Sequence, residues 1–434
     1  MFDDDGRGTP VTHPKRPLVL LANAYPFGTW EPYLEPEVAR LAECFDLSLY
    51  ALSVRSDQRR TKRAVPAGVR VVPLPLHSLL FYALVGIVGL VNADLRKELL
   101  RAWRVPSGRM ACLVYTAKIW TRAQWEARQI RRDLLQHGWS KDTAGVLYSY
   151  RMEYQAYLCY LLKRYFTNAQ VVIRGHASDL EVEHRPGHYV PFREISFSQT
   201  ARIVVISQYN LRYLAQRYPL FVDKIVVSYL GIEDCSEQKW TPDSRLRLVS
   251  VSHLGPTKRV DLMLAAVQQC AQLHPEITMS WKHYGSGEEL QEYRRQATKL
   301  GPQVEAVFVG QVDHDDLIRN LSAGETDLFL STSAREGLPV SMMESMSLGI
   351  PVISTPVAGV PEIVSDGVNG WLLDESAIVE SLSAALWRYY TSDLHEKSAM
   401  RQAARHTWEQ RFSAHAAYAH FIQMLDELYP KENV

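Results

Sequence analysis

The stretch between residues 327 and 355 constrains the fold more than any other. Asp327–Thr332 and Pro351–Thr355 are short runs rich in β-branched, aromatic and other apolar residues, typical of strands buried on both faces of a parallel sheet. Residues 340–348 form a helix-length segment between them. Pro339 fits its first position, and Gly349 can supply a left-handed stop. We therefore predict a strand–helix–strand unit of an open α/β sheet, which binds ligands beyond the carboxyl ends of its strands.

Strand-like runs with helical connections recur along the chain. Its 434 residues fit two domains of about 200 residues each. The polar, proline-containing residues 232–245 are a plausible hinge between them. The strand-like runs before it are 17–23, 146–150, 171–174 and 203–207, and 246–252 opens the second set. We expect a disordered tail (1–15), a first Rossmann-like domain (16–231), a second Rossmann-like domain that binds the donor (246–390) and a C-terminal helical segment (391–434).

Two glutamates mark the predicted ligand site. Glu336 follows the strand at its carboxyl end, and Glu344 lies about a turn and a half into the helix. Backbone N–H groups around Leu338 and Val340 would be unpaired at the helix start, which suits a phosphate or a developing oxyanion. Carboxylates accept hydrogen bonds from vicinal hydroxyls, so the two could hold opposite ends of a nucleotide-sugar. Alternatively, Glu336 is a solvated loop acid and Glu344 a surface helix residue.

The residues around the two glutamates favour the first interpretation, in which Glu336 and Glu344 hold a nucleotide-sugar. Residues 333–339, 344–353, 359–362 and 367–370 closely resemble the retaining GT-B glycosyltransferases of family 4. The resemblance implies two Rossmann-like domains facing across a cleft, with a C-terminal helix crossing back. It also implies that Glu336 contacts hydroxyls of the donor sugar near the reacting carbon and that Glu344 binds the ribose. Gly337, Leu338, Pro339 and Val340 would supply the backbone around the donor phosphates.

Cationic residues follow the first strand of the second domain. The family has an arginine and, five residues later, a lysine, which neutralise the diphosphate leaving group without a metal. Lys258 matches the lysine, whereas His253 departs from the arginine. Histidine can donate to phosphate when protonated, but an unperturbed imidazole is mostly neutral at pH 7. Arg259 could substitute, and Lys258 and Arg259 could also be solvated charges at a helix start.

Three further positions are candidates, His176 and Gly28 by the same resemblance and Gly285 from its local sequence. His176 follows a strand of the first domain, where the family has a histidine reaching toward the donor sugar; Asp179 could orient its ring or cap the next helix. Gly28 would let the backbone approach the donor phosphates. Gly285, in a glycine-rich turn at a strand end, could pass close to a nucleotide. Both glycines could equally be ordinary turn residues.

We expect no metal or other cofactor. Asp313-His314-Asp315 resembles a metal-binding pair only superficially, since no further carboxylate or histidine set completes a shell; Asp315 or Asp316 is expected to cap a helix at 317–321. The five cysteines lack close pairs, which suggests neither a disulfide framework nor a zinc site. The 48 basic and 48 acidic residues balance, which argues against nucleic acid as a partner.

A basic, aromatic segment interrupts the first domain at about 79–141. Residues 94–141 hold eleven Lys or Arg against four Asp or Glu, with Trp103, Trp120, Trp125 and Trp139 interleaved. Such a segment suits a protein that rests on anionic lipid and reaches a lipid-linked acceptor. The alternative is a helical insertion packed on its own sheet. The apolar run 79–91 has 13 residues, fewer than the roughly 20 that span a bilayer.

The sequence thus predicts a retaining, metal-independent glycosyltransferase. It would move a sugar from a nucleotide-diphosphate sugar to a saccharide acceptor, in lipid-linked form, during polysaccharide or glycoconjugate assembly. The acidic N-terminus lacks the pattern of a secretory signal, so we expect a cytoplasmic protein with peripheral contact at the inner face of the membrane. The alternatives are a GT-B epimerase of sugar nucleotides, a phosphorylase-like enzyme, or a non-catalytic subunit that binds nucleotide-sugars.

Overall fold

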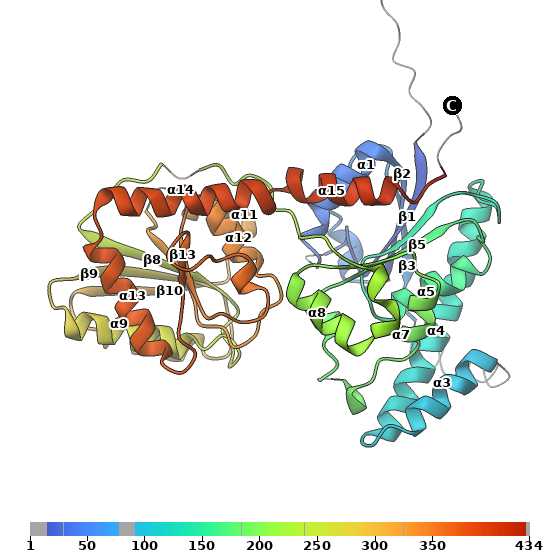
Figure 1. Ribbon diagram of the computed structural model, residues 1–434, viewed down its shortest axis with the longest axis horizontal. Helices are drawn as coiled ribbons and strands as arrows, with labels where there is room; N and C mark the ends of the chain where they lie inside the picture. The colour runs from blue at the N-terminus through green and yellow to red at the C-terminus, as the bar shows by residue number, and fades with distance from the viewer. Residues whose placement is uncertain are drawn as a thin grey trace, which may run out of the picture. The chain divides into compact units, whose positions relative to one another are not determined.

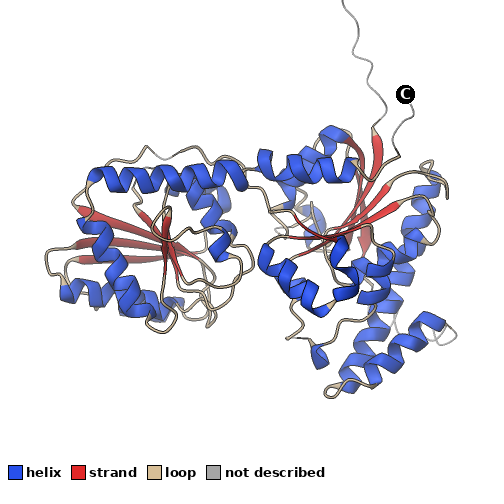
Figure 2. Ribbon diagram, viewed as in Figure 1, coloured by secondary structure: helices blue, strands red, loops and turns tan. Residues whose placement is uncertain are grey.

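The protein divides into two compact units. The computed structural model describes residues 15–28, 30–77, 92–183, 185–237, 239–323 and 325–430, so the predicted tail lies almost wholly outside the described residues. Unit 1 comprises Met1–Arg174, Val182–Ile203 and Ile422–Val434, and unit 2 comprises Gly175–Glu181 and Val204–Phe421. Helices cover a central sheet in each unit (Figure 1; Figure 2).

The first sheet has seven strands in the order β3-β2-β1-β4-β5-β6-β7. The pairs β2–β3, β1–β2, β1–β4 and β4–β5 are parallel, as expected of buried apolar runs joined by helices. The strands are β1 (Arg16–Ala22), β2 (Phe45–Val54), β3 (Arg70–Pro75), β4 (Val146–Ser149), β5 (Gln170–Gly175), β6 (Arg202–Val205) and β7 (Ile225–Val227). The helices of unit 1 are α1 (Leu34–Cys44), η1 (Gln58–Arg60), α3 (Ala93–Trp103), α4 (Arg109–Gln136), α5 (Tyr154–Lys163), η3 (Pro186–His188) and α7 (Arg193–Ser198).

The second sheet has six strands in the order β10-β9-β8-β11-β12-β13, and every neighbouring pair is parallel. Its strands are β8 (Arg245–Val251), β9 (Thr278–Tyr284), β10 (Val304–Gly310), β11 (Leu328–Ser331), β12 (Val352–Ser354) and β13 (Gly370–Leu372). The helices of unit 2 are α6 (Ala177–Leu180), α8 (Gln208–Arg217), η4 (Pro219–Lys224), α9 (Val260–Leu273), α10 (Leu290–Ala297), α11 (His314–Ser322), α12 (Val340–Ser347), η5 (Val360–Glu362), α13 (Ile378–Thr391) and α14 (Leu394–Arg411). The last helix, α15 (Ala414–Asp426), begins in unit 2 and ends in unit 1.

Two apolar cores sandwich the second sheet. Residues of α9, α10 and α13 pack on one face, and residues of α11, α12 and α14 pack on the other (Figure 1). Both faces of β8, β11 and β12 are therefore covered, and nearly every residue of these strands is buried. The core fixes the carboxyl ends of β8 and β11, which are neighbours in the sheet, at one edge.

The chain passes from unit 1 to unit 2 after residue 203 rather than at the expected boundary, residue 231. One reason is Glu362, whose carboxylate accepts hydrogen bonds from the backbone N–H groups of Gln208 (2.7 Å) and Tyr209 (2.9 Å) at the start of α8. It also accepts one from the Tyr229 hydroxyl (3.1 Å). A carboxylate at a helix N-terminus is favourable, so α8 is fastened to unit 2. The boundary at 231 stays a prediction.

The predicted basic insertion corresponds partly to the hairpin of α3 and α4. Residues 78–91, which include its apolar run, lie outside the described residues. Trp120 and Trp139 are buried and Trp125 is half-buried, so these three side chains pack inward, as the alternative interpretation expected. Trp103 is 55% exposed. In the described part of the chain, no helix combines the length and the apolar character needed to cross a membrane.

Candidate functional site

Glu336 and Lys258 meet at the carboxyl edge of the second sheet. Lys258 lies in the loop after β8, and Glu336 lies in the loop after β11, the adjacent strand. The Lys258 ammonium donates a hydrogen bond of 2.5 Å to Oε1 of Glu336, and the two side chains are 26% and 14% exposed. The structure therefore brings together two of the three residues predicted to be catalytic, and each neutralises the charge of the other.

Arg259 connects the same two loops. Its backbone is left-handed (φ 48°), which turns the guanidinium back onto the end of β11. There Nε donates to the carbonyl oxygen of Thr332 (2.7 Å) and Nη2 to that of Ser333 (3.1 Å). The Thr332 hydroxyl returns a hydrogen bond of 2.7 Å to the Arg259 carbonyl oxygen. These contacts give Arg259 a structural role, and its predicted contact with a donor stays a prediction.

Gly337 allows another segment of unit 2 to approach the Glu336 loop. A Cβ added at Gly337 would lie 2.8 Å from the Cβ of Ala177, the first residue of α6. Gly359 approaches from another direction, and its N–H donates to the Gly337 carbonyl oxygen (3.1 Å). An ion pair between Arg335 and Glu181 ties the loop to the residue after α6. The start of α6 is thus held against the loop that carries Glu336.

His176 precedes α6 at this contact and is buried. Its backbone N–H donates to the carboxylate of Asp179 (3.2 Å), so Asp179 caps the helix, one of its two expected roles. Because His176 and Ala177 are consecutive, the packing of Ala177 on Gly337 places the third predicted catalytic residue beside the Glu336 loop. Whether its ring reaches a donor sugar stays a prediction.

Glu344 sits on the helix that follows. Pro339 is the N-cap of α12 rather than its first residue, so the helix starts one residue later than expected. Gly349 ends the segment with φ 73°. The intrahelical bonds begin with the Met342 N–H to the Pro339 carbonyl oxygen (3.2 Å). The backbone N–H groups of Leu338 and Val340 precede this first bond, so they are available to a phosphate.

The carboxylate of Glu344 has a partner that the sequence analysis missed. Oε1 of Glu344 lies 2.7 Å from Nε2 of His314, the first residue of α11. The expectation that Asp315 or Asp316 caps this helix is wrong, because the helix starts three residues earlier than predicted and both aspartates lie in its first turn, with Asp313 at the N-cap. Local sequence carried no signal for the contact, which arises because α11 and α12 share one core.

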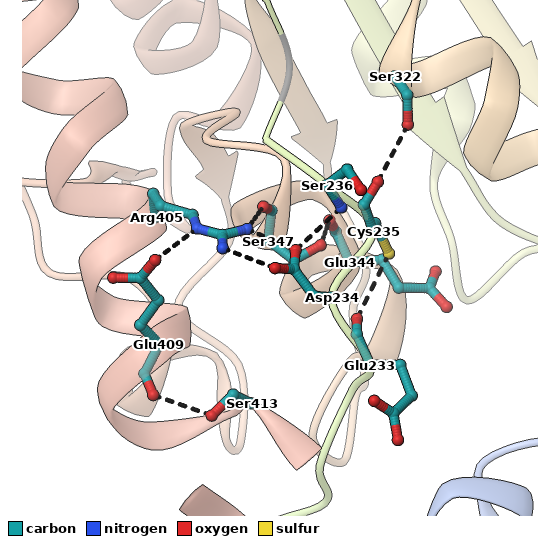
Figure 3. Close-up of polar contacts among 10 residues, drawn as sticks. All are labelled: Glu233, Asp234, Cys235, Ser236, Ser322, Glu344, Ser347, Arg405, Glu409 and Ser413. Carbon is teal, nitrogen blue, oxygen red and sulfur yellow. Dashed lines mark hydrogen bonds and ion pairs between the residues drawn. The ribbon is translucent and has the colours of Figure 1, made fainter. Parts of the chain in front are cut away.

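The far end of α12 is also fastened (Figure 3). The guanidinium of Arg405, on α14, binds both carboxylate oxygens of Asp234 (2.7 and 2.9 Å) and donates to the Ser347 carbonyl oxygen. The Ser347 hydroxyl in turn donates to the Glu344 carbonyl oxygen (2.7 Å). The hydrogen bonds from Arg405 lower the pKa of Asp234, so the carboxylate stays ionised. Glu344 therefore projects from a helix held at both ends.

His253 and Gly285 lie on adjacent loops after β8 and β9. His253 is exposed, and the preceding Ser252 carbonyl oxygen lies 3.2 Å from Nε2 of buried His283. A Cβ at Gly285 (φ 136°) would come within 1.9 Å of that same carbonyl oxygen. Close packing of the two loops therefore requires glycine at 285, as the turn-residue alternative holds, and the predicted contacts of His253 and Gly285 with a donor remain predictions.

Gly28 belongs to unit 1 and has a packing role there. Its φ is 69°, its N–H donates to the Thr61 carbonyl oxygen (2.9 Å), and an added Cβ would lie 3.2 Å from the Gln58 side chain. The nearby carboxylate of Glu31 accepts hydrogen bonds from the N–H groups of residues 23, 24 and 25 (3.3, 3.1 and 3.2 Å). These loop amides are therefore engaged, and the approach of Gly28 to donor phosphates stays a prediction.

No cluster of three or more histidine, cysteine, aspartate or glutamate side chains suited to a metal ion occurs in the parts of the chain that the structure describes. A cavity of about 360 Å³ lies elsewhere in unit 2, on the strand face that carries Arg247 and Lys282, and is lined by none of the predicted site residues.

Residues 232–407 match the sequence model of the family "Glycosyl transferases group 1". The amylovoran biosynthesis glycosyltransferase AmsK of Erwinia amylovora is 27% identical over 264 residues, which are 58% of this chain and 63% of AmsK. The GtfA subunit of the UDP-N-acetylglucosamine–peptide N-acetylglucosaminyltransferase of Streptococcus gordonii is 25% identical over 247 residues, 55% of this chain and 47% of that protein. The chain thus spans less than two thirds of the length of each of these relatives.

Solved structures share the fold at low identity. Anabaena HepE, crystallised with UDP and glucose, has a TM-score of 0.60 and 16% identity, covering 95% of this chain and 100% of HepE. The lipopolysaccharide outer core galactosyltransferase WaaB in its apo form has a TM-score of 0.65 and 14% identity, covering 94% and 99%. The resemblance and the GT-B fold expected from the motifs are thereby confirmed. Residues 232–407 thus carry the sequence pattern of the glycosyltransferase group 1 family, and the chain consists of two Rossmann-like sheets and C-terminal helices in the GT-B arrangement.

Proposed function

We propose that this protein is a retaining glycosyltransferase that needs no metal. It transfers a sugar from a nucleotide-diphosphate sugar to a lipid-linked saccharide acceptor in polysaccharide or glycoconjugate assembly. The observation that carries the proposal is the pair of Lys258 and Glu336, 2.5 Å apart at the carboxyl edge of the second sheet. The match of residues 232–407 to the family and the similarity to the amylovoran biosynthesis glycosyltransferase AmsK support the reaction class.

Lys258 and Glu336 suit the two ends of the bond that breaks, the leaving oxygen and the sugar carbon. In the transfer, the bond between the sugar C1 and the diphosphate oxygen breaks, and a bond from C1 to the acceptor oxygen forms. The acceptor hydroxyl proton leaves with the diphosphate. Lys258 and the N–H groups at the start of α12 would stabilise the negative charge that develops on the leaving oxygen, and Glu336 would hold sugar hydroxyls beside C1. His176 would contact the sugar from the α6 side.

Donor binding would redistribute the charges of the site. Lys258 and Glu336 neutralise each other. A diphosphate brings stronger acceptors for the ammonium, and sugar hydroxyls bring donors for the carboxylate. Both residues would exchange one partner for another, so neither would become a buried charge without a partner. The bound HepE structures are consistent with a nucleotide-sugar donor, since one contains UDP-glucose.

The outer end of the α3–α4 hairpin supports a lipid-linked acceptor. Four large apolar side chains there are more than half exposed, and basic residues surround them; we name this set the hairpin tip. The hairpin tip consists of Leu100, Trp103, Met110 and Val114 with Arg104 and Arg109. Apolar side chains beside arginines suit the interface of an anionic bilayer, where the former enter the acyl boundary and the latter meet phosphates.

Turnover of nucleotide-sugars tests the reaction. A thermal-shift screen with nucleotide-sugars identifies a donor, and its transfer is then measured with and without a lipid-linked saccharide. We expect Glu336→Gln to lose about 10²-fold or more in turnover while binding of the nucleotide diphosphate stays within a few fold. Glu375→Gln, at an exposed loop glutamate of the same unit, is the matched control. Full turnover by Glu336→Gln would reject the role of Glu336.

Vesicle sedimentation tests the membrane contact. We expect retention on phosphatidylglycerol vesicles at low salt and little on phosphatidylcholine. Retention should fall in Trp103→Ser/Met110→Ser and persist in Leu220→Ser, which changes an apolar side chain that is 91% exposed elsewhere. Absence of retention by the wild-type protein at low salt would exclude this part of the proposal.

One alternative has an observation in its favour. A relative is named as a subunit, and a chain of the GtfA/B complex matches with a TM-score of 0.55, covering 71% of this chain. The protein could thus act with a second protein chain or bind nucleotide-sugars without transfer. Binding of donors without hydrolysis or transfer would favour a non-catalytic subunit. Donor turnover that does not need an acceptor would instead favour an epimerase or a phosphorylase-like enzyme.

A further inference from the structure

The contact between His314 and Glu344 is built into the packing of unit 2. The imidazole Nε2 lies 2.7 Å from Oε1 of a carboxylate whose side chain is 9% exposed, whereas the His314 side chain is 61% exposed. Leu317 and Leu321 of α11 pack in the same core as the methionines of α12. The two helix backbones are therefore fixed relative to each other, unlike those of a chance pair of long surface side chains.

This contact occupies one oxygen of the carboxylate and leaves the other. A carboxylate has two oxygens with about four acceptor positions in total, and the neutral imidazole can donate through Nε2 without carrying a charge. When Nε2–H donates to Oε1, it selects one orientation of the carboxylate before a ligand arrives. Oε2 then stays available for a second donor. Because the side chain is already ordered, ligand binding does not include the entropic cost of ordering it.

We propose that His314 is a positioning residue for nucleoside recognition, acting through Glu344 on the vicinal hydroxyls of ribose. The inference rests on the proposed function and on the contact with ribose that the family resemblance implies for Glu344. In this arrangement, Oε2 accepts from a ribose hydroxyl while His314 holds Oε1. The ligand class is a ribonucleoside diphosphate or its sugar conjugate, and a 2′-deoxyribose would gain less from the preorganised carboxylate.

Substitutions at 314 separate this role from general stability. Gln places an amide nitrogen near the position of Nε2 and can still donate to Glu344, whereas Asn places its amide near Nδ1 and falls short. His314→Ala removes the donor. His395→Ala is the matched control, because His395 is an exposed histidine in the first turn of α14 in the same unit. All variants are first compared with the wild-type protein by thermal unfolding.

Calorimetric titration uses the tightest binder among UDP, GDP and ADP together with its 2′-deoxy analogue. We expect the wild-type protein to prefer the ribonucleotide by about tenfold, the usual effect of a hydrogen bond to a charged group. In His314→Ala, ribonucleotide affinity should fall by about 5- to 10-fold, and the preference for the ribonucleotide over its 2′-deoxy analogue should shrink to about twofold. The reason is that a carboxylate without a fixed orientation gains less from its hydrogen bond to the ribose hydroxyl. His314→Gln should regain most of both quantities, and His314→Asn should not. In transfer assays, the donor KM should rise while kcat changes less than about twofold.

An unchanged ribose preference in His314→Ala would overturn the inference, as would equal effects of Gln and Asn. A wild-type protein that does not distinguish ribose from 2′-deoxyribose, or that binds none of the three diphosphates, would overturn it too. Failure of the proposed function has a different signature. A wild-type protein that binds ribonucleotides with the stated preference but transfers no sugar would refute the reaction and leave the role of His314 supported.

Discussion

Gly337→Ala tests whether the segment carrying His176 and the loop carrying Glu336 form one site. The added methyl would lie 2.8 Å from the Cβ of Ala177, whereas carbon atoms at van der Waals contact are about 3.5–4.0 Å apart. The next atoms are 3.9 Å away, at ordinary contact, so one methyl–methyl clash dominates. Relief requires that α6 and the loop separate by roughly 1 Å, because both atoms are attached directly to backbone.

The expected consequences differ for stability and turnover. Overpacking of this kind costs about 1–3 kcal/mol of unfolding free energy. A displacement of about 1 Å between groups that position a substrate can cost about 10²-fold in rate, so turnover should fall more than stability suggests. Ala177→Gly removes the other methyl. Alone, it should cost about 0.5–1 kcal/mol for glycine in a helix, and combined with Gly337→Ala it should restore most of the lost turnover.

Urea unfolding and donor turnover are measured for the two single variants and the double variant. Gly255→Ala is the stability control, since its added Cβ would meet only the His253 ring at 3.6 Å. If Gly337→Ala has wild-type stability and turnover, the packing argument is wrong. If its turnover falls but Ala177→Gly does not restore it, the loss does not arise from the α6 contact, and the placement of His176 in the site loses its support.

Three further outcomes are expected. Burial lowers the pKa of His283 from 6.5 to about 4. Between these pH values the unfolded chain is protonated at His283 and the folded protein is not, so the free energy of unfolding decreases as pH falls from 6.5 toward 4. This group should remove about 1.4 kcal/mol between pH 7.5 and 5.5, and His283→Gln should show a shallower decline in urea titrations; an identical decline would contradict the assignment. Arg405→Met should cost about 1–3 kcal/mol, because the carboxylate of Asp234 and the end of α12 both lose their donor, and an unchanged urea midpoint would show that the contact contributes nothing. Sugar transfer should persist after dialysis against EDTA, and activity restored only by added Mg²⁺ or Mn²⁺ would refute metal independence.

The strand–helix–strand pattern was predictable because it depends on residues close in sequence. The strand-like segments 246–252 and 327–332 became β8 and β11 within one residue at each end, since both faces of these strands are buried. The left-handed Gly349 was predictable from its position after a helix. Errors occurred at helix starts. Pro339 became an N-cap, and α11 began three residues before the expected start because Asp313 takes the extended N-cap conformation and continues directly into the helix.

Contacts between distant segments could not be predicted from local sequence. The partner of Glu344 lies 30 positions earlier, and Glu362 meets α8 across more than 150 residues. Gly285 and Gly337 were named as possible neighbours of a ligand, yet the structure gives each a packing reason as well. A glycine in such a loop lets the backbone come close to its neighbour, whether that neighbour is a ligand or another loop. Their presence alone therefore cannot separate ligand contact from packing.

The paired charges of the predicted site favour one kind of ligand. Each predicted carboxylate already has a nitrogen partner, Lys258 for Glu336 and His314 for Glu344. A simple sugar offers hydroxyls to the carboxylates but nothing to Lys258, and inorganic diphosphate offers the reverse. Only a molecule with hydroxyls at both ends and a diphosphate between them can replace or complement both pairs at once. A nucleotide-diphosphate sugar has this order of groups, so the proposed function predicts selectivity for the intact donor over its fragments.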